Sequence, residues 1–173
     1  MNTAQKNAIA ILIAGFIVFF GWEIFQERPQ KVKHEVLRTL TFAIAGPMTG
    51  ESARIGQELK AAVEILVENL NANEVVPKTK FLVKTFDDAN NPEKAVQVAK
   101  EIVAETDVVA VIGHSLSATS LAAAPIYAAA NLPVVTPAST TPTLTRNYDN
   151  YFSTIFSDPI QGRFMADYVT LGL

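Results

Sequence analysis

The chain contains no cysteine, and this absence excludes several kinds of chemistry at once. Without thiols it forms no disulfide, no thiolate metal site and no cysteine nucleophile, and it carries no lipid attached to cysteine. Histidine is scarce as well, because only His34 and His114 occur. We therefore expect neither a bound metal ion nor another cofactor.

A basic surface is also missing. From residue 39 to the end there are 9 Lys and Arg against 14 Asp and Glu, a balance of −5. Proteins that bind nucleic acid need a concentration of positive charge to neutralise phosphates. We therefore expect no nucleic acid partner. With 173 residues, 49% of them hydrophobic, the chain has room for one domain of ordinary size and a short appendage.

The appendage is the apolar N-terminal segment. Residues 8–22 (AIAILIAGFIVFFGW) carry no charge and are followed by no small-residue cleavage motif. As a helix these 15 residues would measure about 22 Å. We interpret residues 1–25 as an uncleaved signal anchor or transmembrane helix, with a cleaved signal peptide or a buried core helix as alternatives. Residues 26–38 are polar and read as a linker, and the domain that follows is expected outside the cytoplasmic membrane.

From residue 39 onward the pattern alternates between strands and helices. Apolar runs typical of buried strands occur at 39–45, 80–86, 107–113 and 133–136, with a fifth expected at 152–156. Between them, apolar residues with helical spacing predict helices from Ile55, from Asn91-Pro92, from Ser117 and from near Pro159. Such alternation indicates an α/β fold with a doubly wound parallel sheet in three layers.

In such sheets ligands bind beyond the carboxyl ends of the strands. The segments that follow the predicted strands are rich in Gly, Ser, Thr, Asn and Asp, at 46–52, 87–91, 113–117 and 137–142. Helix N-termini that point at the same crevice present free N–H groups and favour an anion such as a carboxylate.

Two motifs in these segments suggest chemistry that we reject. Gly113-His114-Ser115-Leu116-Ser117 is close to the nucleophile elbow of α/β-hydrolases, but no histidine follows Ser115 to serve as its base. Asp87 and Asp88 suggest a magnesium site, but one pair offers too few oxygen ligands. We expect Asp87 and Asp88 to form a solvated turn that enters the next helix, and His114 to be a partly buried, hydrogen-bonded residue.

The order of these segments resembles the first lobe of the leucine/isoleucine/valine-binding proteins, members of the type I periplasmic binding protein family. The matching stretches are IAGPMTG, FDDANNPEKAVQVAKEIV, VIGHSLSATSLAAAPIYAAANLPVVTPAST with TPTLT, and FSTIFSDPIQGRFMADYV. The resemblance implies a ligand-binding lobe over residues 39–173. It departs from the family in two ways: the second lobe is absent, and Ile55 falls near a position that is often aromatic.

Carried over onto this sequence, the family's ligand contacts fall on four residues. Ser117 would hold the ligand carboxylate, the carbonyl of Ala138 would accept from the ammonium group, and Thr140 would contact the ligand head, with Ser139 between them. The resemblance thus implies binding of a small ligand such as an amino acid for uptake by the membrane subunits of an ABC transporter, without catalysis. Two alternatives stay open: a membrane-tethered sensory or protein-interaction module, and a truncated or split product that needs a second chain to supply the other lobe.

Overall fold

The computed structural model describes residues 35–172. The expected anchor, 1–25, and most of the expected linker lie outside the described residues, so both stay predictions. In the described part, no helix is long and apolar enough to cross a membrane. The elements follow in the order β1 (Arg38–Gly46), α2 (Ala53–Ala72), β2 (Thr79–Asp87), α3 (Pro92–Ala104), β3 (Val108–Gly113), α4 (Ser117–Ala129), β4 (Val134–Thr136), α5 (Thr143–Asn147), β5 (Tyr151–Ser153) and α6 (Asp158–Gly172).

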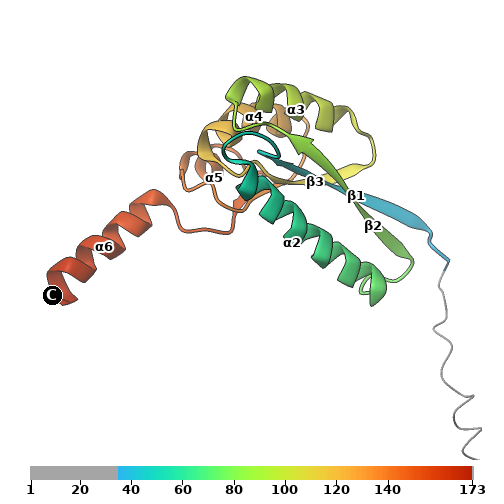
Figure 1. Cartoon of the computed structure of the whole chain (residues 1–173), viewed down its shortest axis with the longest axis horizontal. Helices are drawn as coiled ribbons and strands as arrows, with labels where there is room; N and C mark the ends of the chain where they lie inside the picture. The colour runs from blue at the N-terminus through green and yellow to red at the C-terminus, as the bar shows by residue number, and fades with distance from the viewer. Residues whose placement is uncertain (1–34, 173) are drawn as a thin grey trace, which may run out of the picture. The chain divides into compact units, whose positions relative to one another are not determined.

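The strands form one parallel sheet of five strands in the order β2-β1-β3-β4-β5 (Figure 1). This confirms the predicted α/β architecture. The first strand, β1, lies second from one edge of the sheet; from it the chain moves outward to β2 and then crosses back to β3. Because all strands are parallel, their carboxyl ends lie along the same edge, so the loops after β1, β2, β3 and β4 are neighbours there.

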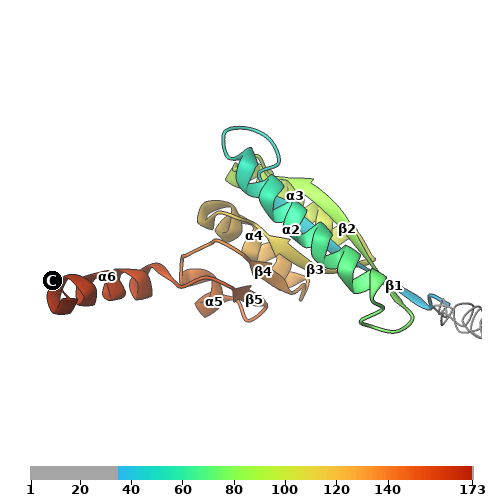
Figure 2. The ribbon, with the colours of Figure 1, turned by 60° about the horizontal axis from the view of Figure 1, so that its bottom comes forward.

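Alternating residues of β1 divide the core between the two faces of the sheet. Ala43 and Ala45 pack with buried residues of α3 and α4, whereas Ile44 packs with Val63 and Val67 of α2. Figures 1 and 2 show α2 on one side of the sheet and α3 and α4 on the other.

The α2 face of the sheet is only partly covered, although the run at 107–113 was expected to be a buried strand. Ile44, Ile112, Val135 and Phe152 are paired in register across β1, β3, β4 and β5 and form an apolar row. Ile44 is fully buried beneath α2, Ile112 and Val135 are half-buried, and Phe152 is 55% exposed. Exposure rises along the row because α2 packs over β1 and β2. The helix that contacts β5, α5, packs through Leu144 with the core on the opposite face.

The C-terminal part differs most from the sequence prediction. The short helix α5 was not predicted, since only Leu144 of its five residues is buried and it offers no apolar periodicity. The last strand is Tyr151–Ser153 rather than 152–156, because the chain turns where Ser153 Oγ bonds to Ile155. The predicted helix near Pro159 is present as α6, and its side chains from Asp158 to Leu171 are all exposed.

Candidate functional site

The predicted contact residues lie in two neighbouring loops at the carboxyl edge. Ser117 is the first residue of α4, directly after the β3 loop, and Ala138, Ser139 and Thr140 lie in the β4–α5 loop. Because β3 and β4 pair directly, the structure brings these two loops to the same edge of the sheet, as predicted.

The side chains of these residues differ in burial and in hydrogen bonding. Ser117 and Thr140 are half-buried, and neither hydroxyl has a hydrogen-bond partner among residues 35–172. Ser139 is only 1% exposed, and its side chain is bonded inside the protein. The hydroxyls of Ser117 and Thr140 are thus available to a ligand, whereas that of Ser139 is engaged.

A cavity of about 250 Å³ opens beside Thr140. Its lining combines Ser and Thr with an apolar group formed by Ile155, Phe156 and Ile160, and it contains Ser139 and Thr140 but not Ser117 or Ala138. The N–H of Asp158, at the start of α6, donates to the carbonyl of Thr140 at 3.0 Å. The structure therefore places only two of the four predicted residues in this cavity, and a crevice shared by all four stays a prediction.

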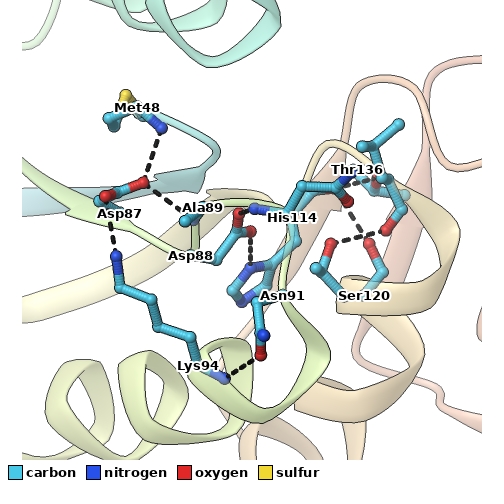
Figure 3. Close-up of polar contacts among 12 residues, drawn as sticks. Met48, Asp87, Asp88, Ala89, Asn91, Lys94, His114, Ser120 and Thr136 are labelled. Carbon is cyan, nitrogen blue, oxygen red and sulfur yellow. Dashed lines mark hydrogen bonds and ion pairs between the residues drawn. The ribbon is translucent and has the colours of Figure 1, made fainter. Parts of the chain in front are cut away.

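Asp87, at the end of β2, holds the loop that follows β1. Its carboxylate accepts hydrogen bonds from the N–H of Met48 at 2.8 Å, from the Thr49 hydroxyl at 2.7 Å and from the Lys94 ammonium group at 2.8 Å (Figure 3). Burial alone would raise the pKa of Asp87, but these bonds and that from the N–H of Ala89 outweigh it and hold the pKa well below its ordinary value. Asp87 is therefore an ionised anchor for the β1–α2 loop.

Asp88 points the other way, into the protein, and this corrects the expectation of a solvated turn. It is fully buried, as are His114 and Tyr127. The Nδ1 atom of His114 lies 2.6 Å from Asp88 Oδ2 (Figure 3). The Nε2 atom lies 3.0 Å from the Tyr127 hydroxyl. Because a carboxylate only accepts, the proton between Asp88 and His114 is carried by Nδ1. Burial raises the pKa of the Tyr127 phenol, whose hydroxyl contacts Nε2.

His114 was expected to be partly buried, but it is completely enclosed, and its carbonyl is as heavily bonded as its ring. Three hydroxyls lie within bonding distance of this oxygen: Thr136 at 2.8 Å, Ser120 at 3.0 Å and Ser139 at 3.4 Å. His114 therefore connects the ends of β2, β3 and β4 with α4.

Within residues 35–172, the nucleophile-elbow motif does not bring a serine and a histidine together. Ser115, the would-be nucleophile, is fully buried, and its hydroxyl has no partner among the described residues. His114 bonds to Asp88 and Tyr127 instead. Over residues 35–172 there is no group of three or more His, Cys, Asp or Glu that could hold a metal ion.

The periplasmic binding protein family model matches residues 39–172. The chain belongs to this family. Among curated members, it is 34% identical over 134 residues to a leucine-, isoleucine-, valine-, threonine- and alanine-binding protein of Pseudomonas aeruginosa, covering 75% of this chain and 36% of the relative. It is also 34% identical over 128 residues to the Leu/Ile/Val-binding protein of Escherichia coli, covering 73% and 35%.

Solved structures of periplasmic binding proteins agree with the fold. A leucine-binding protein from Thermotoga maritima matches with a TM-score of 0.69 and 30% identity, covering 77% of this chain and 37% of that one. A branched-chain amino acid binding protein from Streptococcus pneumoniae, solved with isoleucine, matches with a TM-score of 0.71 and 25% identity, covering 77% and 38%. The chain thus spans little more than a third of the length of these binding proteins.

The sequence analysis did not identify the buried residues that are bonded around His114. Ser120, Tyr127 and Thr136 were not singled out, Asp88 was placed in a solvated turn, and His114 was expected only to be partly buried and hydrogen-bonded. The one available indication was that His114 directly follows a predicted strand and that Asp88 is the second residue after another. In a parallel sheet such residues lie along the same edge, but β1 separates β2 from β3, and the pattern does not say that the two side chains turn inward and meet.

Proposed function

We propose that this chain binds an amino acid, as the first lobe of a two-lobed periplasmic binding protein that delivers its ligand to the membrane subunits of an ABC-type uptake transporter. The names of the relatives support an amino acid as ligand. The family also favours a location in the periplasm. Tethering through residues 8–22 is a further part of the proposal, supported by their apolar sequence. The proposal includes no catalysis and no cofactor.

One observation carries the proposal: the unengaged hydroxyls of Ser117 and Thr140 occur in adjacent loops at the carboxyl edge. Ser117 begins α4, and the residue before it, Leu116, provides no side-chain cap. The N–H groups of the first turn of a helix favour an anion. A ligand carboxylate at Ser117 would therefore receive hydrogen bonds from both the backbone and the hydroxyl.

The β4–α5 loop is suited to the other end of an amino acid. The carbonyl of Ala138 is an acceptor for an ammonium group, and Thr140 adds a hydroxyl and an N–H. Ser139, although predicted as a ligand contact, would contribute through its place in the chain rather than through its engaged side chain. Donors on α4 and acceptors on the neighbouring loop match the charge distribution of a zwitterion.

A single lobe covers one side of such a ligand. Each hydrogen bond that remains in contact with water contributes only about 0.5–1.5 kcal/mol, and association itself costs about 4–15 kcal/mol. We therefore expect this chain alone to bind at roughly millimolar concentration or more weakly. Tight binding would need a second lobe, which we propose is provided by a further polypeptide segment or a second chain.

The test is an NMR titration of the full chain in detergent with L-isoleucine. We expect saturable, millimolar shifts of the amide resonances of Ser117 and Thr140. Isoleucinol, which lacks the carboxylate, should leave the Ser117 resonance unchanged. Thr140→Val should weaken binding, whereas Thr39→Val, an exposed position at the opposite end of β1, should not. Absence of shifts with every amino acid tested would refute the proposal and favour a protein-interaction module instead.

A further inference from the structure

The hydroxyl groups around the His114 carbonyl form a closed ring of hydrogen bonds. Thr136 Oγ1 and Ser120 Oγ lie 2.8 Å and 3.0 Å from this oxygen, and Ser120 Oγ lies 2.6 Å from Ser139 Oγ. The ring is completed by the N–H of Ser139, which donates to Thr136 Oγ1 at 3.2 Å. All four residues are 0–1% exposed.

The donors of this ring can be assigned because each hydroxyl has a single hydrogen. The carbonyl oxygen has two lone pairs, and its two shorter contacts are with Thr136 and Ser120. The Ser139 hydroxyl lies farther away, at 3.4 Å, so its hydrogen goes to Ser120 Oγ. Ser139 is therefore held at two points, through its N–H by Thr136 and through its hydroxyl by Ser120.

The ring joins the two halves of the proposed ligand site. Ser120 lies three residues after Ser117 on α4, and Ser139 directly precedes Thr140. Figure 3 shows Ser120 and Thr136 converging on His114 from α4 and from β4. His114 is in turn fixed through its ring by Asp88 and Tyr127. The loops that carry Ser117 and Thr140 are thus joined by hydrogen bonds among buried groups.

We propose that this ring, closed by Thr136 and Ser139, sets the spacing between the carboxylate-binding and ammonium-binding loops, so that Thr136 and Ser139 are positioning residues for the ligand. The effect on affinity rests on the proposed amino acid binding. The effect on the geometry of the loops does not, since it belongs to the unliganded chain.

Thr136 allows a test that separates positioning from stability. Thr136→Val removes the hydroxyl and keeps the side-chain volume, whereas Thr136→Ser keeps the hydroxyl and loses a buried methyl group. With L-isoleucine as the probe and the full chain in detergent, we expect Val to weaken binding at least tenfold and Ser to remain within about twofold of the native affinity, although Ser also lowers the melting temperature. If the loss of affinity in Thr136→Val and Thr136→Ser is proportional to the loss of melting temperature in each, the proposal is overturned.

The amide resonances of Ser117 and Thr140 in the unliganded chain provide a second measurement. Thr136→Val should shift both, and Thr136→Ser and the surface control Thr39→Val should leave them close to native. If the native chain binds no amino acid, the proposed function fails, but the ring is still judged by these shifts. Unshifted resonances in Thr136→Val would refute it regardless of the ligand result.

Discussion

Removal of the Asp88 carboxylate should be among the most destabilising single changes at the carboxyl edge. In Asp88→Ala, two donors lose their acceptor: the Nδ1–H of His114, which is 2.6 Å from Asp88 Oδ2, and the N–H of Asn90, 2.8 Å from Oδ1. A buried donor left unsatisfied costs about 1–3 kcal/mol, and more where the lost partner was charged. We expect a loss of roughly 3–5 kcal/mol in the free energy of unfolding.

Tyr127→Phe tests the other side of the imidazole and should have a smaller effect. It removes only the hydroxyl 3.0 Å from His114 Nε2, and the ring can keep its packing. The expected loss is about 1–3 kcal/mol. Because Asp88 and Tyr127 act through the same imidazole, the double variant should lose less than the two single losses added together, by about 0.5 kcal/mol or more.

Urea unfolding monitored by circular dichroism measures these free energies. Asp149→Ala is the matched control, because Asp149 is exposed and a surface substitution usually stays within about 0.5 kcal/mol. A loss of less than about 1 kcal/mol in Asp88→Ala would show that the buried network does not hold the edge together. Strict additivity in the double variant would show that His114 does not connect its two partners.

Three further predictions concern other positions. The pKa of Asp87 is lowered on folding, so its carboxylate stabilises the fold fully above the ordinary pKa of about 4, and this stabilisation is lost as the pH falls below that value. The urea midpoint of Asp87→Asn should therefore vary less between pH 5 and pH 2 than that of the native chain. Gly113→Ala should prevent folding, because Gly113 has a φ of +134° and a Cβ there would lie 1.9 Å from the Ala45 carbonyl oxygen. The control is Gly162→Ala on exposed α6, where a Cβ would meet nothing within 4 Å; it should raise the melting temperature or leave it unchanged. Ser115→Ala should cost less than about 0.5 kcal/mol in urea unfolding, because the hydroxyl it removes has no partner among the described residues; any ester hydrolysis that disappears in this variant would contradict a binding role.

The repetitive part of the fold could be predicted from the sequence because its determinants are local. The side-chain cap of α3 is an example: Asn91 accepts from the N–H of Lys94 at 2.9 Å, and Pro92 occupies the first turn. The apolar stripe from Ile55 to Leu70 likewise marks α2 without reference to any other element. Such features depend on residues a few positions apart, which sequence spacing describes directly.

The buried polar centre could not be predicted, because it depends on distant pairs. His114 meets Asp88 across 26 positions and Thr136 across 22. Whether an aspartate after a strand faces water or the interior depends on which groups the neighbouring strands bring beside it. Asp87 and Asp88 are adjacent and chemically identical, yet one holds a surface loop and the other is sealed inside, and no periodicity distinguishes them.

The apolar row from Ile44 to Phe152 becomes more exposed toward β5, and this predicts where local unfolding of the domain begins. Local unfolding begins where few buried contacts are lost, so amide hydrogens of β5 should exchange with solvent faster than those of β1. When β5 separates, the hydrogen bond from the Thr154 N–H to the Thr136 carbonyl breaks with it. The start of α6 is then held through the bond from the Asp158 N–H to the Thr140 carbonyl. The fast-exchanging edge of the sheet is therefore next to one half of the proposed ligand site, while the half on α4 belongs to its slowly exchanging centre.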